Sequence, residues 1–392
     1  MKAKIVHIVT RLDFGGAQQN TLYTIAHLDR KRFEPILFTG PGGYLDPQAK
    51  ELQATTKVCF VTDLVREISP LQDLTALLEL TRLLREEKPA VVHTHSSKAG
   101  ILGRFAAFLA GVPLILHTYH GFGFHDRQHR IVKSLYVLLE RLASRISSRL
   151  IFVSQANIDY AAQHKLLDPK DAVLIRSGVR LEGLPAPLRD VKEKRASVGI
   201  RRDPVLIISV GNLKAQKNPD AFLEVAEHVV EKNKRVFFLF VGDGPAKLKL
   251  QSRTILKGLS RHVQFLGWRD DVRELLAASD IFLMTSLWEG LPRALVEAMK
   301  TGLPSVCYAV DGVKDLIRDG LNGYSCQAGD VIGLADRITQ LVENRTLRQE
   351  LGKTARDDIG EEFDIDFMVR QQESLLDEML ASKTPTTARP NP

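Results

Sequence analysis

The sequence is poor in cysteine and has no long hydrophobic run. Its three cysteines, Cys59, Cys307 and Cys326, form an odd set without metal-ligand spacing. This argues against a disulfide framework and indicates reduced thiols. No apolar run approaches the roughly twenty residues that cross a bilayer, and residues 1–10 enter a strand-like stretch without a cleavable signal. From these absences we expect a folded protein that stays in the cytoplasm.

Positive charge is concentrated in the first half of the chain. Of 392 residues, positions 1–185 contain 24 Lys and Arg against 17 Asp and Glu, whereas the remainder contains 30 of each. This length exceeds what one hydrophobic core supports, which favours two domains. The basic excess predicts that the first half meets an anionic partner, although a solvated surface is the alternative. We expect no nucleic-acid partner.

Short apolar or β-branched runs alternate with longer helical patterns in both halves. Strands that are apolar throughout are typical of parallel sheets whose two faces are covered by helices. The pattern therefore predicts an α/β protein of two doubly wound, Rossmann-like domains that face each other across a cleft, with ligands beyond the carboxyl ends of the strands. The runs are 5–9, 35–39, 58–61, 90–94, 114–118 and 150–153, then 205–210, 236–241, 263–266, 281–285 and 305–308.

A change of composition marks the expected domain boundary. Residues 183–190 contain two prolines and lose the helical and strand periodicity, which is typical of a linker. We therefore expect one domain over 1–185 and a second over 186–364. The helical pattern at 365–381 is expected to pack back toward the first domain. Residues 382–392 are rich in Pro and Thr and are expected to form a disordered tail.

The segment with the most chemical information is SLWEGLPRALVEAM at 286–299, directly after an apolar run. Pro292 suits the first turn of a helix and Gly302 its end, so Glu289 should lie before the helix and Glu297 inside it. Backbone N–H groups at the helix start can bind a diphosphate. The two glutamates can accept hydrogen bonds from sugar and ribose hydroxyls. Without the surrounding motif, two glutamates eight residues apart are more typical of a helix cap and a charged surface residue.

Within its longer string, this Glu-x7-Glu pattern resembles the signature of retaining GT-B glycosyltransferases of family 4. The resemblance extends from residue 4 to about 375, because further motifs follow in the family's order. It implies a retaining hexosyltransferase of the EC 2.4 class that uses a nucleotide diphosphate sugar. The motifs are Gly15-Gly16, HTYHG at 117–121, VGNLKAQKN at 210–218, VGDG at 241–244 and DGVKDLIRDGLNG at 311–323.

The resemblance implies roles for individual donor-site residues. Glu297 would hold the nucleotide ribose and Glu289 the donor sugar, while Lys217 would neutralise the departing diphosphate. The first loop, at Gly15 and Gly16, would let the backbone approach that diphosphate closely. The other donor-binding candidates are Asn212, Lys214, Gly290, Leu291 and Pro292.

One position departs from the family pattern. Asn212 stands where many members carry an arginine, so one cation over the diphosphate is missing. Lys214 is a candidate replacement, or it points into solvent. We identify no Asp-x-Asp metal motif anywhere in the chain, so we expect no divalent metal and no cofactor. UDP is the expected nucleotide on family grounds alone.

Histidines follow two expected strands of the first half. The counterpart of His120 in the family lies beside the transferred sugar, so His120 is a catalytic candidate. His93, His95 and Ser97 are candidates on the acceptor side, although histidines at strand ends are more often structural. The segments HTHSSKAG and HGFGFH look similar to those of exopolysaccharide, capsule and O-antigen transferases. The resemblance therefore implies an undecaprenyl-diphosphate-linked glycan, or another oligosaccharide, as the acceptor.

Residues 127–150 combine a basic face with an apolar one. The segment contains six Arg or Lys and one Glu. On a helix, five of the cations fall within about 160° of arc, with the apolar side chains on the adjoining side. Such a helix can lie on anionic lipid, which predicts a peripheral position at the inner face of the membrane. A core-facing helix with a solvated basic face is the alternative.

Three other functions share parts of this pattern. A nucleotide-sugar epimerase can have the same two-lobed fold but needs no acceptor. A dinucleotide-dependent oxidoreductase fits less well, because FGGAQQN follows the first strand in place of G-x-G-x-x-G. A solute-binding protein would normally carry an export signal. We expect a sugar transferase of surface polysaccharide synthesis, with the epimerase as the alternative.

Overall fold

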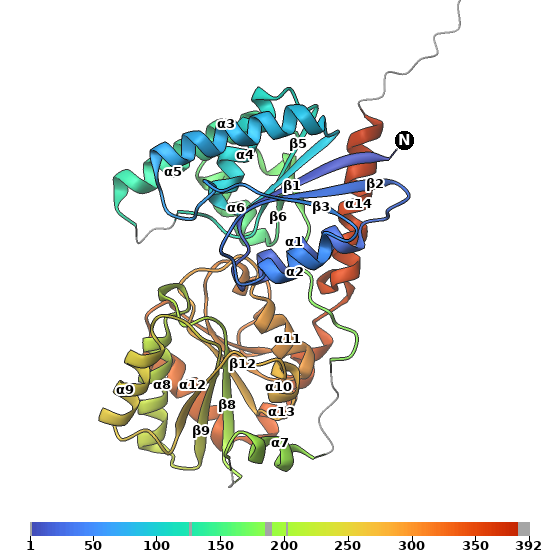
Figure 1. Ribbon diagram of the computed structural model, residues 1–392. Coiled ribbons are helices and arrows are strands. Elements are labelled where there is room, and N and C mark those ends of the chain that lie inside the picture. Colours follow the sequence, from blue (N-terminus) through green and yellow to red (C-terminus); the bar gives the residue numbers. More distant parts are fainter. Residues whose placement is uncertain (1, 125–127, 185–189, 201–202, 383–392) are drawn as a thin grey trace, which may run out of the picture. The chain divides into compact units, whose positions relative to one another are not determined.

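The computed structural model describes residues 2–124, 128–184, 190–200 and 203–382. The chain forms two compact α/β units, shown in Figure 1: residues 1–178 with 365–392 form unit 1, and residues 179–364 form unit 2. The expected boundary at 185/186 and most of the tail at 382–392 lie outside the described residues. The division between the units falls a few residues earlier, between Gly178 and Val179.

Unit 1 is built on a seven-stranded parallel sheet in the order β3-β2-β1-β4-β5-β6-β7. Its strands are β1 (Ala3–Arg11), β2 (Phe33–Gly40), β3 (Lys57–Phe60), β4 (Val91–His95), β5 (Leu114–Tyr119), β6 (Arg149–Phe152) and β7 (Ala172–Leu174). Its helices are α1 (Gly16–His27), α2 (Asp46–Leu52), α3 (Pro70–Glu87), α4 (Ser97–Leu109), α5 (Arg130–Arg145), α6 (Gln155–Gln163) and α14 (Ile365–Ala381).

Helices cover both faces of this sheet, which explains its continuously apolar strands. On β1, Ile5 packs with Met368 and Leu376 of α14, whereas Val6 and Ile8 belong to the core under α3 and α4. Successive strand residues point to opposite faces, so both sets are buried. The last helix thus belongs to unit 1, although it follows unit 2 in the sequence.

Unit 2 contains a six-stranded parallel sheet in the order β10-β9-β8-β11-β12-β13. Its strands are β8 (Val205–Val210), β9 (Val236–Val241), β10 (Val263–Gly267), β11 (Ile281–Met284), β12 (Ser305–Tyr308) and β13 (Gly323–Cys326). Its helices are α7 (Val191–Ser197), α8 (Pro219–Lys232), α9 (Lys247–Leu256), α10 (Val272–Ala277), α11 (Arg293–Thr301), α12 (Val331–Glu343) and α13 (Arg345–Asp357). Short 3₁₀ turns are η1 (Pro169–Asp171), η2 (Ala215–Lys217), η3 (Asp311–Val313) and η4 (Glu361–Phe363).

The strand order reverses once in each sheet, between β1 and β4 and between β8 and β11. At such a switch point the loops after the two strands diverge to opposite faces and leave room for a ligand at the carboxyl edge. The prediction of two doubly wound α/β domains is confirmed, and each of the eleven predicted strands is present. The two further strands, β7 and β13, are short edge strands that the sequence pattern did not reveal.

None of the helices in the described part of the chain combines the length and the hydropathy that a bilayer-spanning segment requires.

Candidate functional site

The switch point of unit 2 brings together two of the predicted site residues. Lys217 ends η2, in the loop after β8, and Glu289 lies in the loop after β11. The Lys217 Nζ atom lies 2.5 Å from Glu289 Oε1, and both side chains are largely buried. The pairing of β8 with β11 places these loops side by side. The arrangement provides one cation and one carboxylate at the edge where ligands bind in such sheets.

Hydrogen bonds fix the loop that carries Glu289 from two sides. Gln216 Nε2 donates to the Trp288 carbonyl at 2.9 Å, and Leu287 N donates to the Gln216 carbonyl at 2.8 Å. From the other side, Glu289 N donates to Asp311 Oδ2 at 2.7 Å. These bonds hold the Glu289 backbone in one place.

Glycine is required beside this loop. A Cβ atom on Gly312 would lie 2.0 Å from the Gly290 carbonyl oxygen. The close approach of the two backbones therefore depends on the missing side chain. Gly290, Leu291 and Pro292 are themselves buried.

Helix α11 begins at Arg293, directly after Pro292, and ends where Gly302 adopts a left-handed conformation with φ of 89°. Proline has no side-chain acceptor, so it does not cap the first backbone N–H groups of the helix. Glu289 precedes the helix and Glu297 lies inside it, as the motif predicted. The helix dipole adds partial positive charge at this end.

Glu297 lies one turn after Arg293 on α11. Burial raises the pKa of the Glu297 carboxyl, while the nearby Arg293 and Arg273 oppose that rise. Burial likewise lowers the pKa of Arg293. A desolvated carboxylate gains most from hydrogen-bond donors, and the two hydroxyls of a ribose are such donors.

Two polar atoms near these loops lack a hydrogen-bond partner among the described residues. They are Asn212 Oδ1, in the loop after β8, and Ser286 Oγ, after β11, and both are buried. Buried polar atoms are nearly always hydrogen-bonded, so this pair fits an additional donor or acceptor supplied by a ligand. Lys214 is half-buried and precedes η2. Its role as a replacement cation for Asn212 stays a prediction.

Gly15 and Gly16 lie where β1 passes into α1 in unit 1. Gly15 adopts an extended backbone with φ of −171°, which any residue can take. A Cβ atom at Gly15 would meet only the flexible end of Gln18, at 2.9 Å. The fold itself therefore does not require glycine at this position.

The acceptor-side histidines gather at the switch point of unit 1. His93 and His95 lie on β4, and His120 directly follows β5. His95 Nδ1 lies 3.2 Å from His120 Nε2, while His93 Nε2 lies 2.7 Å from Thr118 Oγ1. Ser97 begins α4 at the same carboxyl edge, after Ser96 with φ of 63°. The structure thus brings three predicted histidines into one cluster.

Sequence reasoning missed two residues of these sites. His7 on β1 lies beside His93 in the sheet, and its Nδ1 atom is 3.3 Å from His95 Nε2. The ring nitrogens of His7, His93 and His95 all lie within 4.8 Å of one another, close enough for a shared metal ion. Asp311, which holds Glu289, was missed as well. A histidine within an apolar strand was the available signal for His7.

One sequence observation needs correction. An Asp-x-Asp pair does occur, at Asp364 and Asp366. Asp364 Oδ2 accepts a hydrogen bond from Leu181 N at 3.3 Å in unit 2, and Asp366 Oδ1 accepts one from Tyr23 at 2.6 Å in unit 1. The two carboxylates therefore serve separate structural contacts.

Helix α5 exposes the apolar side chains that the sequence placed on one face. Ile131, Leu135, Leu138 and Leu142 have between 39% and 73% of their surface exposed. Its core contacts come instead from three buried residues, Val137, Glu140 and Ala143. The interpretation of α5 as a helix whose apolar face packs on the core is therefore wrong. Arg127, the first residue of the predicted segment, lies outside the described residues.

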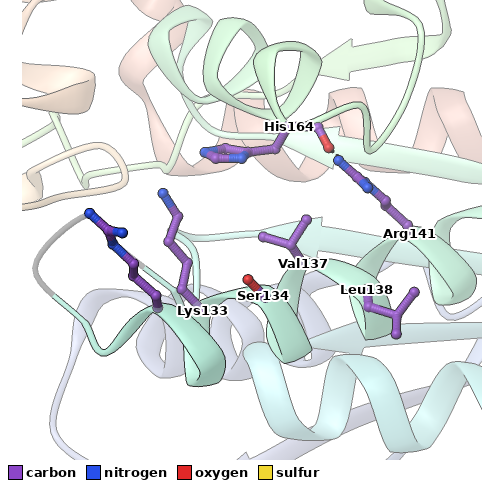
Figure 2. A pocket seen from close by; sticks show the side chains of 7 residues that line it. Lys133, Ser134, Val137, Leu138, Arg141 and His164 are labelled. Atoms are coloured by element: carbon purple, nitrogen blue, oxygen red, sulfur yellow. Dashed lines mark hydrogen bonds between the residues drawn. The ribbon is translucent and has the colours of Figure 1, made fainter.

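A basic pocket of about 390 Å³ lies between α5 and the end of α6. Figure 2 shows the side chains of Lys133, Arg141 and His164 around it. Arg130 also contributes to the lining, and Arg141 Nε donates to the His164 carbonyl at 2.8 Å. Three cations around one hollow favour an anionic ligand.

Two family models match the chain. The model for glycosyl transferases group 1 matches residues 190–358, and the model for the glycosyl transferase 4-like domain matches residues 15–178. The first match contains Lys217, Glu289 and Glu297, and the second contains the histidine cluster from His93 onward. Together the two matches cover most of both units.

Curated relatives and solved structures agree with these matches. The UDP-Gal:alpha-D-GlcNAc-diphosphoundecaprenol alpha-1,3-galactosyltransferase of Escherichia coli is 34% identical over 97% of this chain and 98% of its own. The capsular polysaccharide biosynthesis glycosyltransferase CapM of Staphylococcus aureus is 23% identical over 84% of this chain and 88% of its own. The structure of Anabaena HepE in complex with UDP-glucose shares the fold, with a TM-score of 0.81 at 22% identity over 96% of this chain and 100% of the other.

Proposed function

Because the chain belongs to the group 1 glycosyltransferases and has their GT-B fold, we propose that it transfers a hexose from a UDP-sugar to an undecaprenyl-diphosphate-linked glycan. The product would be an intermediate of a bacterial surface polysaccharide. The observation that carries the proposal is the Lys217–Glu289 pair beside the start of α11, at the switch point of unit 2. The proposal includes retention of the anomeric configuration.

Unit 2 would bind the donor. The diphosphate would accept hydrogen bonds from the first N–H groups of α11 and from Lys217, which supplies the positive charge. Glu297 would hold the ribose, because its burial favours contact with two hydroxyl donors. Glu289 would contact the sugar from a backbone position fixed by Asp311. Asn212 and Ser286 offer further polar contacts.

Catalysis in this proposal rests on position and charge. As the sugar leaves, negative charge develops on the diphosphate, and Lys217 with the α11 N–H groups would stabilise it. Holding donor and acceptor on one face of the sugar removes much of the entropic barrier. Lys214 is the candidate for the second cation. We propose that neither a metal ion nor a cofactor takes part.

Unit 1 would bind the acceptor. His120, at the carboxyl end of β5, would hydrogen-bond the transferred sugar, with His93, His95 and Ser97 nearby on the acceptor side. Gly15 and Gly16 would admit the diphosphate of the donor to the first loop. The fold does not require glycine at position 15, which supports a reason for it outside the fold.

The acceptor lipid requires contact with a membrane. We propose a cytoplasmic enzyme that lies peripherally at the inner face of the membrane, through α5. The exposed apolar side chains of α5 would enter the headgroup region while Arg130, Lys133 and Arg141 meet lipid phosphates. Helix α3 adds exposed leucines at Leu71, Leu74 and Leu78, and α4 packs between α3 and α5.

Release of UDP distinguishes the proposed sugar transfer from the alternative, epimerisation of the nucleotide sugar. The purified full chain is incubated with a panel of UDP- and GDP-sugars, with and without undecaprenyl-diphosphate-linked GlcNAc. Release of UDP only when the acceptor is present, with a product one hexose longer, supports transfer. Isomerisation of the donor without acceptor would instead identify an epimerase, for which family membership gives no support.

A further inference from the structure

One stripe of α5 lines most of the basic pocket between α5 and α6 (Figure 2). His164, at the end of α6, lies on the other side of the pocket. The pocket volume of about 390 Å³ is within the range of about 300–1,000 Å³ that is typical of small-molecule sites. At about 100° per residue, five of the lining residues fall within roughly 100° of arc on α5. They are Arg130, Lys133, Ser134, Val137 and Arg141.

The lining carries positive charge that its own side chains do not neutralise. It contains three Arg or Lys side chains and, among the described residues, no Asp or Glu. Neither Arg130 nor Arg141 forms an ion pair with another residue in the part of the chain that the structure describes. An anionic group is therefore the ligand that this lining favours.

Arg141 is ordered by a contact within unit 1. Its Nε atom donates to the His164 carbonyl at 2.8 Å, which holds the guanidinium against the end of α6. This bond uses one of the five N–H groups of the side chain and leaves the four on the two Nη atoms. A planar guanidinium presents such groups as a fork that suits phosphate oxygens. Little side-chain entropy remains to be lost when a ligand binds there.

An exposed apolar stripe runs beside the pocket on the same helix. It consists of Ile131, Leu135, Leu138 and Leu142, which have between 39% and 73% of their surface exposed. Leu138 belongs both to this stripe and to the lining of the pocket. A ligand that matches both surfaces has an anionic group joined to a hydrocarbon chain. A free inorganic phosphate would use the cations alone.

The loop after β5 connects the pocket with His120. Phe124 lies four residues after His120, so their Cα atoms are at most about 14 Å apart. The buried Phe124 ring lies edge-on to the His164 ring, with 5.4 Å between the ring centroids. In the acceptor that tests the proposed function, a single sugar ring separates the reacting hydroxyl from the diphosphate. The pocket therefore lies within reach of a diphosphate whose sugar meets His120.

We propose that this pocket binds the diphosphate of the polyprenyl-linked acceptor, and that the polyprenyl chain leaves along the apolar stripe of α5. The identity of the substrate rests on the proposed function. The inference deepens that function, because it assigns one pocket and one occupant where a general attraction to lipid phosphates needs neither. The pocket belongs to unit 1, whereas Lys217 and α11 belong to unit 2. The diphosphates of acceptor and donor thus have separate sites.

Binding of farnesyl diphosphate tests the pocket without a membrane, because this probe joins a diphosphate to a short isoprenoid chain. The full chain is titrated by calorimetry with UDP at saturation, so that the donor site is already occupied. Arg130→Gln and Lys133→Gln should each weaken binding roughly tenfold, since each removes a hydrogen bond to a charged group. Inorganic diphosphate should bind more weakly than farnesyl diphosphate. Equal affinity for the two probes, or no effect of either variant, would overturn the proposal.

Arg145→Gln is the matched control. Arg145 is exposed at the end of the same helix and carries the same charge, but it does not line the pocket. This variant should leave the affinity for farnesyl diphosphate unaltered, whereas it should reduce binding to anionic vesicles about as much as Arg130→Gln does. A loss of farnesyl diphosphate affinity equal to that of Arg130→Gln would show only a general attraction to positive charge, and it would overturn the pocket.

Turnover separates this inference from the proposed function. In the UDP-release assay, Arg130→Gln should raise KM for undecaprenyl-diphosphate-linked GlcNAc roughly tenfold and leave KM for the donor unaltered. Transfer with an unaltered KM for the acceptor would overturn the pocket while the proposed function stands. No transfer to any acceptor, together with binding of farnesyl diphosphate that depends on Arg130, would refute the proposed function and support an isoprenoid diphosphate site.

Discussion

Lys217 and Glu289 form an ion pair at the carboxyl edge of unit 2, although 72 residues separate them in the sequence. The adjacent strands β8 and β11 bring them together, and both side chains are largely shielded from water. The pair keeps a cation in place before any ligand arrives. In the proposed function, a diphosphate bound beside α11 would compete with Glu289 for the same ammonium group.

Removal of Lys217 should slow transfer, and it should also lower stability because the largely buried Glu289 loses its partner. Lys217→Ala should lower kcat by about 10² to 10³, the range for loss of one group that stabilises developing charge. Lys232→Ala is the matched control, because Lys232 forms an ion pair with Asp336 on the exposed surface of the same unit. Steady-state UDP release measures both variants. Equal rates of UDP release for the two variants would show that Lys217 takes no part in transfer.

The two glutamates of the motif should have separable effects. Glu289→Ala should mainly lower kcat, whereas Glu297→Gln should weaken UDP binding by roughly tenfold or more, because a hydrogen bond to a charged group is lost. Isothermal titration with UDP and turnover assays distinguish the two. Tight UDP binding by Glu297→Gln would contradict the ribose role.

Glu297→Gln should also stabilise the fold. Burial raises the pKa of Glu297, so its ionised form is less favourable in the folded chain than in the unfolded chain, and its contribution to stability falls as pH rises through the folded pKa. At neutral pH the glutamine removes that cost, and Tm should rise by a few degrees. Exposed Glu343 supplies the control: Glu343→Gln should leave Tm and UDP binding unaltered.

Acid should destabilise unit 1 through its buried histidines. The pKa values of His7, His93, His95 and His117 are all lowered by burial, that of His7 to about 3. Their contribution is therefore complete above the unfolded value near 6.5 and is lost as pH falls below it, by about 1.4 kcal/mol per pH unit for each group. Urea unfolding at pH 7.5, 6.5 and 5.5 should show this loss, with a shallower slope in His93→Gln. Equal stability at pH 7.5 and 5.5 would contradict the buried, neutral state of the cluster.

Glu140 anchors α5 to the core by a buried ion pair. Glu140 Oε2 lies 2.5 Å from Arg104 Nη2 on α4, and it also accepts a hydrogen bond from Tyr119 OH at 2.8 Å. Glu140→Leu leaves the Arg104 charge unpaired, so it should lower the free energy of unfolding by about 3 to 5 kcal/mol. The double variant Arg104→Met/Glu140→Leu should recover most of that loss. Additive losses in the double variant would show that the pair is not coupled.

Membrane contact should depend on both faces of α5. Flotation should show the chain on anionic vesicles and little of it on neutral ones, since each cation near the surface adds roughly 1 kcal/mol. Ile131→Ser should weaken that binding, whereas Leu248→Ser, at an equally exposed position on α9, should not. Equal binding to both kinds of vesicle, or to neither, would exclude the proposed role of α5.

Much of the fold follows from the sequence because buried parallel strands are apolar throughout. Val205–Val210, Val236–Val241 and Ser305–Tyr308 have the predicted bounds. The edge strand Gly323–Cys326 escaped prediction because only its first half is buried, so its residues do not form an apolar run. Local pattern therefore located the central strands and the apolar edge strands β3 and β10, and missed the edge strands β7 and β13.

The candidate site was also predicted only in part. The motif itself placed Glu289 before α11 and Glu297 inside it, because Pro292 and Gly302 delimit that helix. The partners of these residues come from distant segments: Asp311 holds the Glu289 backbone, and His7 contacts His95 across the sheet. Contacts of this kind depend on strand order, which the sequence pattern does not specify.

A crystal structure with bound UDP-sugar tests the central claim most directly. The account predicts the diphosphate at the first N–H groups of α11 and at Lys217, with the ribose hydroxyls on Glu297. Nucleotide bound elsewhere in unit 2, or held without either Lys217 or Glu297, would contradict it.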